Sequence, residues 1–333
     1  MIGSAVLGTG SRSGGQRLLS EEIDDRLRKP RGWLEKQCGV RERPVLAETE
    51  TQEAIALLAA QSALADAGLH PEDLDLFLFA SAVGRQPIPA TASLLKDGLG
   101  LRKSSIPAFD VNATCLSVIA ALDIAALYIG AGRAGHVLIV ASEVATRALP
   151  WEQDPATAGL FGDGAAALIL GADEVRQASL RVNSVRLETW SEGYDFCTLG
   201  AGGTRYDFHT DRDDFERNAY FQMDGHALFK LTRNKLPDFL DRLLETAGWS
   251  RKDVDLVIPH QASPLALEHM IRKCGFDRDA VFSTVRETGN LVAASIPMTL
   301  DTARRSGRVK TGDKILLIGT SAGVSLGGAT LTA

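Results

Sequence analysis

The stretch Phe109-Asp110-Val111-Asn112-Ala113-Thr114-Cys115-Leu116-Ser117 leads directly into a long apolar run over residues 118–130. The first residues predict a short strand and a tight turn, and the run is apolar on nearly every face, as in a helix buried on all sides. Cys115 would then lie at a helix N-terminus, where free N–H groups and the helix dipole favour a thiolate. The position suits a nucleophilic sulfur or a small buried apolar side chain, so partners must decide between them.

Two polar residues downstream are candidate partners for the cysteine. His260 follows the apolar run Val257-Ile258-Pro259, where a strand should give way to a loop, and Asn290 lies beside Gly289 ahead of small residues that begin another helix. Catalytic groups collect on loops at strand ends. Taken singly, His260 could be a core histidine and Asn290 a helix cap. The order Cys, His, Asn in these contexts favours a catalytic set.

Seven segments together resemble one known family. They are Trp33 with Gly39-Val40-Arg41-Glu42-Arg43, Ala108 to Val111 with Cys115, Phe161-Gly162-Asp163-Gly164-Ala165-Ala166, Phe221-Gln222-Met223-Asp224-Gly225, Pro259-His260-Gln261-Ala262, Gly289-Asn290 with Ala293-Ala294-Ser295-Ile296-Pro297, and Ser321-Ala322-Gly323. In this order, over nearly the whole chain, they resemble β-ketoacyl-acyl-carrier-protein synthase III, a condensing enzyme of the thiolase superfamily.

Bulk composition agrees with an enzyme of that kind. A chain of 333 residues is long enough for two packed domains, and 36 basic against 42 acidic residues, without a block of like charge, argue against nucleic-acid binding. No segment has the pattern of a signal peptide or the apolar length of a membrane span. The four cysteines are scattered without a Cys-x-x-Cys pair, which favours reduced thiols over a metal site. We therefore expect a cytoplasmic enzyme with no metal.

The two halves of the sequence repeat one pattern. Residues 67–78 end a helix, turn and enter a strand, and residues 247–258 do the same; residues 132–140 resemble 307–318 more loosely. Strands alternating with helices predict an α/β fold with parallel strands. The resemblance implies a thiolase-like fold of two pseudo-symmetric halves in a five-layer αβαβα arrangement. We place the halves at residues 1–172 and 173–333, with the active site at their junction.

The resemblance also implies a two-stage reaction. Cys115 would take an acyl group from acyl-coenzyme A, with the backbone N–H groups of Cys115 and Ala322 as the oxyanion hole. His260 and Asn290 would then stabilise the enolate formed when a malonyl thioester loses carbon dioxide. No cofactor is needed beyond these thioester substrates. An acyl carrier protein and a second copy of the chain, in a homodimer, are the expected protein partners.

Expected substrate contacts depart from the family in several places. Trp33 matches a tryptophan that stacks on the adenine of coenzyme A, Gly289 belongs to the glycine–asparagine motif, and Ile88 falls where a phenylalanine of the partner subunit often closes the acyl pocket. Arginines of the family are replaced by Gln37, by Pro155 and within Ser263-Pro264-Leu265. Phosphate and carrier contacts must therefore differ. A specialised fatty-acid or polyketide enzyme, with a longer or branched acyl group, fits better than a housekeeping acetyl-CoA enzyme.

Other functions stay open from the sequence. The same residues could transfer the acyl group to an alcohol or amine without decarboxylation, and Cys, His, Asn is also the order of papain-like thioester or amide hydrolases, although Cys115 lacks their flanking motif. Cys38, Cys197 and Cys274 are interpreted as structural. The basic residues Arg304, Arg305, Arg308 and Lys310 predict a solvated helix end rather than a docking site for an acidic carrier.

Overall fold

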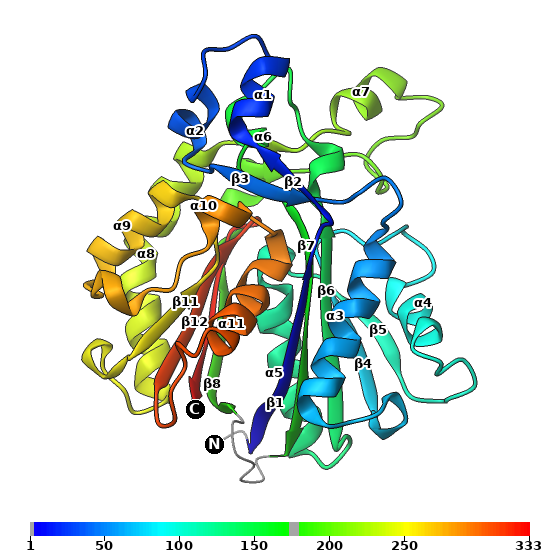
Figure 1. The fold of residues 1–333 in the computed structure, drawn as a ribbon, viewed down its shortest axis with the longest axis vertical. Coiled ribbons are helices and arrows are strands. Elements are labelled where there is room, and N and C mark those ends of the chain that lie inside the picture. The colour runs from blue at the N-terminus through cyan, green and yellow to red at the C-terminus, as the bar shows by residue number, and fades with distance from the viewer. Residues whose placement is uncertain (1–2, 173–179) are drawn as a thin grey trace.

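Two half-sheets joined by a short seam organise the chain in the computed structural model, which describes residues 3–172 and 180–333 (Figure 1). The strand order is β11-β12-β13-β8-β1-β7-β6-β4-β5. The seam pairs β1 with β8 over only three residues, Ser4 to Val6 against Leu180 to Val182. Beyond the seam the half-sheets diverge and leave room for helices between them. The strands are β1 (Ser4–Ser13), β4 (Leu76–Ala80), β5 (Ala108–Val111), β6 (His136–Val144), β7 (Asp163–Ala172), β8 (Leu180–Thr189), β11 (Leu256–Pro259), β12 (Lys314–Ser321) and β13 (Ser325–Thr332).

The half-sheets have the same topology about the seam. Moving outward, the first runs β1-β7-β6-β4-β5 and the second β8-β13-β12-β11, after which Val281 forms a parallel bridge to Val257 in the place of a last strand. The registers agree too, since Leu76 pairs with Val137 in the first half and Leu256 with Ile315 in the second. The sequence repeat is thus a structural repeat.

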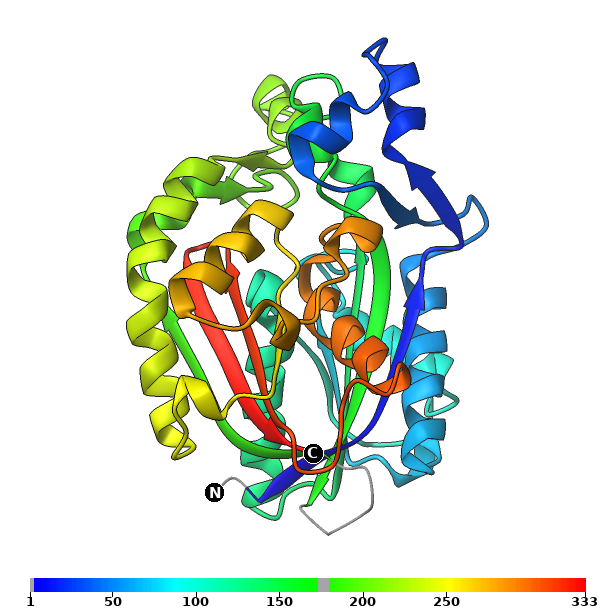
Figure 2. The same ribbon diagram turned by 60° about the vertical axis from the view of Figure 1, so that its left-hand side comes forward.

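Helices form three layers around the two half-sheets, which confirms the expected αβαβα arrangement. α3 (Gln52–Ala67) and α4 (Thr91–Gly98) cover the outer face of the first half-sheet, and α8 (Gly225–Thr246) and α9 (Pro264–Cys274) cover that of the second. α5 (Ser117–Gly130) and α11 (Ser295–Arg305) lie between the half-sheets, as Figure 2 shows. Three apolar cores fill the space between these layers, and α5 is buried along most of its length.

Local sequence signals explain where these helices begin and how closely they pack. Thr51 accepts a hydrogen bond from the N–H of Ala54 at the start of α3, and Ser263 caps α9 with Pro264 in its first turn. The outer helix α3 lies so close to β1 that a Cβ on Gly10 would be 2.4 Å from a backbone oxygen of α3. Small residues on both elements therefore set the spacing of this layer.

A cap of short elements lies beyond the end of the half-sheets that carries the active-site loops, at the top of Figure 1. Its centre is the fully buried Arg43, whose guanidinium donates to the carbonyl oxygens of Leu18 and Gly159 and to the hydroxyl of Ser20. The cap and its neighbours comprise β2 (Gln16–Leu19), α1 (Ser20–Arg26), α2 (Trp33–Cys38), β3 (Glu42–Val45), α6 (Pro155–Ala158), β9 (Cys197–Thr198), α7 (Arg212–Arg217), β10 (Gln222–Met223) and α10 (Val285–Thr288).

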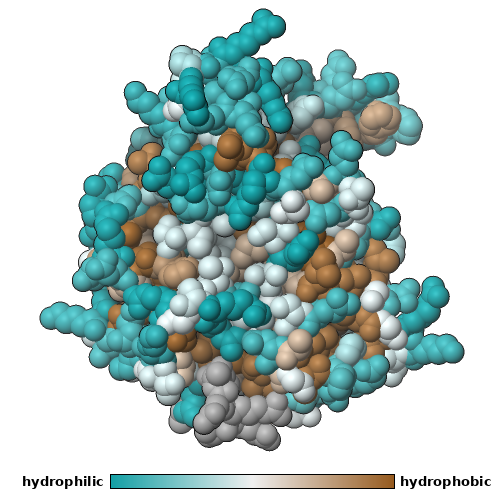
Figure 3. Space-filling model, in the orientation of Figure 1, coloured by the Kyte–Doolittle hydropathy of each residue, from teal (hydrophilic) through white to brown (hydrophobic). Residues whose placement is uncertain are grey.

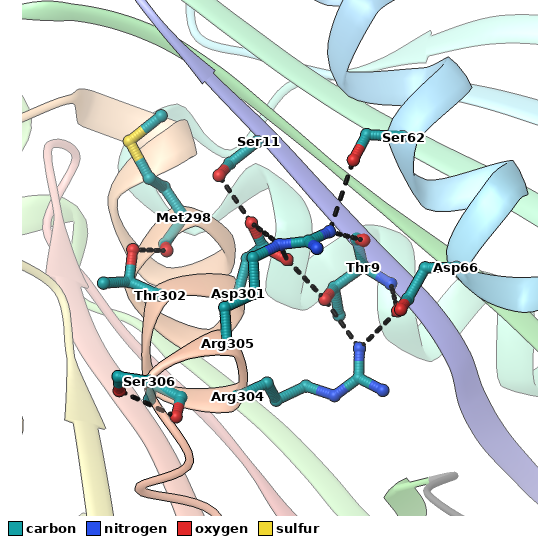
Figure 4. Close-up of polar contacts among 11 residues, drawn as sticks. Thr9, Ser11, Ser62, Asp66, Met298, Asp301, Thr302, Arg304, Arg305 and Ser306 are labelled. Atoms are coloured by element: carbon teal, nitrogen blue, oxygen red, sulfur yellow. Dashed lines mark hydrogen bonds and ion pairs between the residues drawn. The ribbon is translucent and has the colours of Figure 1, made fainter.

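The basic end of α11 is a structural clamp, so the expectation of a solvated helix end is wrong for Arg304, whereas Arg305 is exposed as expected although it too has partners. Arg304 donates to Thr9 and pairs with Asp66 of α3, and Arg305 pairs with Asp301 and donates to the backbone of Thr9 (Figure 4). Asp301 itself is buried and accepts from the hydroxyls of Thr9 and Ser11. This cluster joins α11 of the second half to β1 and α3 of the first.

The predicted boundary between the halves lies at the edge of the described residues. β7 ends at Ala172, and residues 173–179, where the second half was predicted to begin, lie outside the described part of the chain. The division at 172/173 therefore stays a prediction. No helix within residues 3–172 and 180–333 is long and apolar enough to cross a membrane.

Candidate active site

Cys115 lies in a tight 3₁₀ turn, Thr114–Leu116, between β5 and α5. Thr114 adopts a left-handed conformation, with φ of 52°, that a β-branched residue rarely adopts. Two side chains hold it there: the Asn112 side-chain oxygen accepts from the N–H of Thr114 at 2.9 Å, and the Ser117 hydroxyl accepts from the N–H of Ala113 at 3.0 Å. Backbone strain kept in place by dedicated hydrogen bonds is typical of functional turns.

The turn that carries Asn290 has the same construction. Val292 has a φ of 49°, the Asn290 side-chain oxygen accepts from the N–H of Val292 at 2.8 Å, and the Ser295 hydroxyl accepts from the N–H of Leu291 at 2.9 Å. Ala293 takes the place that Cys115 has in the first turn. Because the N–H of Val292 occupies the amide oxygen of Asn290, its NH₂ group is the donor for a ligand; one N–H donates to the carbonyl oxygen of Ala262 at 3.4 Å, which leaves the other.

His260 follows β11, and its backbone N–H donates to Ile318 of β12 at 2.8 Å. The neighbouring Gln261 is buried and accepts from the N–H groups of Thr284 and Val285, which holds the loop. Gly319 is required beside it, since a Cβ there would be 2.7 Å from the Cβ of His260. The imidazole is therefore fixed between two strands.

Burial determines the charge of this histidine. His260 is 5% exposed, and burial lowers its pKa to about 4, so the ring is neutral near pH 7. Its Nδ1 atom is enclosed and finds no hydrogen-bond partner among the described residues. Nε2 is then the nitrogen that can reach a ligand. A neutral imidazole can donate from one nitrogen without bringing a positive charge.

Cys115, His260 and Asn290 line a single cavity of about 1540 Å³. They come from three loops, one in the first half and two in the second: Cys115 follows β5, His260 follows β11 and Asn290 follows α10. Ala322, which follows β12, lines the same cavity. Among the described residues, no oxygen of another residue accepts from the backbone N–H of Cys115 or of Ala322. Both N–H groups are available to a substrate oxygen.

The sulfur is a thiol at neutral pH, contrary to the thiolate expected from the helix N-terminus. Burial raises the pKa of Cys115, and the nearby carboxyl of Glu143 and the thiol of Cys197 raise it further. The free N–H groups and dipole at the start of α5 do not outweigh the cost of burying a charge. Cys115 must therefore lose a proton as it reacts.

Two further ionisable residues of the cavity were missed as site residues. Glu143 is 3% exposed, and burial raises its pKa to about 8 although backbone N–H groups stabilise its charge. Its signal in the sequence was an ionisable residue inside the otherwise apolar strand 137–144. Cys197, interpreted as structural, also lines the cavity, and burial raises its pKa to about 11.

The three predicted substrate-binding residues lie outside the cavity wall. Trp33 is half-buried at the start of α2, with the ammonium of Lys29 5.2 Å from its ring. Ile88 is 85% exposed, on a loop whose residues 85–87 do line the cavity. Gly289 has a φ of 62°, and a Cβ on it would lie 2.6 Å from the carbonyl oxygen of Leu160. Its role in this structure is to let the backbone pass beside Leu160.

The cavity wall is mostly apolar, with basic groups among its lining residues. Leu265, at a position where the sequence departs from the family, lines it and is 77% exposed. Arg147, Arg233 and Arg272 also belong to the lining. Within residues 3–172 and 180–333, no three His, Cys, Asp or Glu side chains are grouped as a metal site.

Comparisons with known proteins find two family-model matches and relatives that cover nearly the whole chain. Residues 109–189 match a model of 3-oxoacyl-[acyl-carrier-protein (ACP)] synthase III, and residues 244–333 match its C-terminal model. The chain is 34% identical to beta-ketoacyl-[acyl-carrier-protein] synthase III of Coxiella burnetii, over 99% of both chains, and 32% identical to that of Neisseria gonorrhoeae, over 98% of both. The crystal structure of 3-oxoacyl-[acyl-carrier-protein] synthase III from Aquifex aeolicus VF5 is 30% identical and superposes with a TM-score of 0.88, over 99% of this chain and all of that one.

Proposed function

Since the chain belongs to the 3-oxoacyl-[acyl-carrier-protein] synthase III family of acyltransferases, we propose that it joins an acyl group to a malonyl thioester through an acyl-Cys115 intermediate. The observation that carries this proposal is that Cys115, His260 and Asn290 line one cavity. The neutral state of His260 and the NH₂ group of Asn290 support the proposal.

In the first step, the Cys115 sulfur attacks the carbonyl carbon of an acyl-coenzyme A. Because the sulfur begins as a thiol, its proton must leave as the C–S bond forms, and the departing coenzyme A sulfur takes it up, so that His260 keeps its Nε2–H for the second step. The N–H groups of Cys115 and Ala322 stabilise the oxyanion. Coenzyme A leaves with the proton, and the acyl group remains on sulfur.

In the second step, a malonyl thioester loses carbon dioxide and its thioester oxygen gains charge. His260 Nε2–H and the Asn290 NH₂ group donate to that oxygen, and the resulting carbanion attacks the acyl-cysteine. A β-ketoacyl thioester leaves and the Cys115 sulfur is released. Neutral donors suit this step because they stabilise the enolate without supplying an acidic proton that would quench the carbanion.

We propose an acyl donor longer than acetyl. The cavity of about 1540 Å³ is larger than the roughly 300–1000 Å³ of common small-molecule pockets. Its apolar lining from α8 and α9 includes Leu228, Leu236 and Met270. Burial of a long hydrocarbon chain against these side chains would stabilise the bound donor, whereas the methyl group of an acetyl donor is too short to reach them.

Basic lining residues are the candidates for the phosphate contacts. The family arginines replaced at Gln37 and Pro155 leave Arg147, Arg233 and Arg272 as guanidinium groups that can meet the phosphates of coenzyme A or of a carrier-bound pantetheine. A carrier protein approaching this side would meet the apolar Leu265 as well. We therefore propose a carrier protein with an acidic surface and an apolar contact.

The protein is further proposed to act as a homodimer in the cytoplasm. β5 is an edge strand of the large sheet and can pair with its copy in a second chain. Val83, Ile88 and Leu94, near this edge, are exposed apolar residues, and Figure 3 shows hydrophobic side chains gathered on the side of α3 and α4. All four cysteines are free, which suits a reducing compartment.

The function is tested by the intact mass of the protein after incubation with acyl-coenzyme A donors of increasing chain length. We expect an adduct on the wild type with a long-chain donor, none on Cys115→Ala, and an unchanged adduct on Cys197→Ala, whose thiol lines the same cavity. Malonyl carrier protein added next should discharge the adduct with release of carbon dioxide. If the acyl group of the adduct is instead transferred to water or to an amine, the reaction is hydrolysis or simple acyl transfer rather than condensation.

A further inference from the structure

Glu143 is a buried carboxyl in the cavity to which the proposed reaction gives no role. It lies near the end of β6, and its Oε1 accepts from the backbone N–H of Ala82 at 2.7 Å. The N–H groups of Val83 and Ala293 also face the carboxyl and stabilise its charged form. β6 packs directly against the turn Val292–Ala294. Glu143 therefore joins the loop after β4 to the turn that holds Asn290.

The pseudo-symmetry of the fold gives Glu143 a counterpart. The matching strand registers place Glu143 of β6 in correspondence with Ser321 of β12, and β12 packs against the Cys115 turn as β6 packs against the Ala293 turn. Ser321 donates its hydroxyl to the carbonyl oxygen of Ala113 at 2.8 Å. It thus steadies the first turn from behind and does not cover the N–H of Cys115.

The backbone N–H groups of Cys115 and Ala293 are therefore equivalent in the two turns but face different surroundings. The Cys115 N–H is left open to the cavity, whereas the Ala293 N–H faces an oxygen supplied by the chain itself. An oxygen anion at such a turn is what the oxyanion hole binds during acyl transfer. The carboxyl of Glu143, whose pKa burial raises to about 8, places an acceptor oxygen at the second turn where the first would bind that anion.

We propose that Glu143 is a positioning residue for the condensation step: its carboxyl caps the Ala293 turn and so keeps the Asn290 NH₂ group directed into the cavity. The proposal rests on the proposed function, because it concerns the half-reaction assigned to Asn290. Asn290 and Ala293 belong to one strained turn, with Val292 in the left-handed region between them. Loss of the cap removes an acceptor from that turn and leaves a buried N–H unpaired.

The test compares Glu143→Ala, Glu143→Gln and wild type in two assays, formation of the acyl-cysteine by intact mass and its discharge by malonyl carrier protein. We expect Glu143→Ala to load Cys115 no more slowly than wild type, because the carboxyl that raises the pKa of the thiol is gone, and to condense at least about tenfold more slowly. Glu143→Gln keeps an acceptor oxygen and should retain most of both rates. Added sodium formate, a free carboxylate, should restore condensation to Glu143→Ala but not to Asn290→Ala.

Specific outcomes would overturn the proposal. Equal loss of loading and condensation in Glu143→Ala would assign Glu143 to general stability, and a Gln variant as slow as the Ala variant would assign it a proton-transfer role. If Glu143→Ala does not fold, Glu143→Asp serves in its place, because its shorter side chain withdraws the carboxyl from Ala293 and should slow condensation alone. A wild type that forms no adduct would instead refute the proposed function.

Discussion

The turn at residues 112–117 and the turn at residues 290–295 have the same backbone hydrogen bonds but present different chemical groups to the cavity. Both begin with an asparagine whose side-chain oxygen accepts from the N–H two residues on, and both end with a serine that accepts from the second residue of the turn. The first exposes a sulfur and a free N–H, and the second exposes an amide NH₂ group. The duplicated fold therefore supplies the scaffold, while the chemistry depends on which groups of each turn can still bind a ligand.

The helices after the two turns differ in the same way. Asp123 of α5 and Asp301 of α11 occupy equivalent places, since each lies six residues after the serine of its turn. Asp301 pairs with Arg305 and accepts from Thr9 and Ser11. Asp123 has no such partner among the described residues, and burial raises its pKa. The second helix is therefore a clamp between the halves, and the first is held mainly by apolar packing.

Cys115→Ala gives the turn at 112–117 the alanine that the turn at 290–295 has at the same place, and it should have the largest effect on activity. Cys115→Ala is expected to lose acyl loading by at least about four orders of magnitude, because no other group of the cavity replaces a positioned nucleophile. The measurement is intact mass with the preferred acyl donor. Cys197→Ala is the control and should load normally. Loading that survives in Cys115→Ala would mean that the acyl group is carried elsewhere.

Truncation of the two asparagines should separate the two half-reactions. Asn290→Ala is expected to slow condensation about 10²- to 10³-fold while loading continues, since the lost NH₂ group stabilises only the enolate. Asn112→Ala removes the equivalent turn acceptor and should instead slow loading, because it loosens the Cys115 turn. Single-turnover assays of each step provide the comparison. If both variants slow the same step, the division of roles between the turns is wrong.

The sequence predicted the β5–α5 junction, the repeat and the residues that meet in the cavity because each has a local signal. An apolar run such as 118–130 specifies a buried helix whatever lies around it. Cys115, His260 and Asn290 each stand at a change from strand to loop or from loop to helix, where catalytic groups are expected. These are properties of short stretches of chain.

What the sequence could not supply were effects of distant neighbours. The thiolate expected at Cys115 is opposed by burial and by Glu143, which is close in space although it belongs to another strand. Arg304 ends a helix and was predicted to be solvated, yet its partners Thr9 and Asp66 lie more than two hundred residues away in the chain. Such contacts depend on the packing of the two halves and leave no periodic pattern.

Breaking the clamp tests whether α11 holds the halves together. Asp301→Ala is expected to lower the free energy of unfolding by about 2–3 kcal/mol, because it leaves Thr9 and Ser11 without an acceptor and Arg305 without its counter-charge; the half-exposed guanidinium keeps the loss below that of a fully buried pair. Urea unfolding measures it. Asp123→Ala, at the equivalent place in α5, should cost much less. Equal losses would remove the distinction between the helices.

The smallest expected effect is that of Asp123→Asn on stability. It should be opposite in sign to the effect of Asp301→Asn at the equivalent place in α11. Burial raises the pKa of Asp123, so the folded protein holds this proton more tightly than the unfolded chain does. As pH rises from the ordinary aspartate pKa of 3.8 through the raised pKa of Asp123, ionisation of the buried carboxyl destabilises the folded wild type. Asparagine cannot ionise, so the variant does not lose this stability. The side chain is partly exposed, so solvent screening keeps the difference small. Urea unfolding below and above this range should find Asp123→Asn gaining on the wild type as pH rises, whereas Asp301→Asn, which weakens an ion pair, should lose stability at neutral pH. An Asp123→Asn variant that falls behind the wild type with rising pH would show that a charge partner does reach α5.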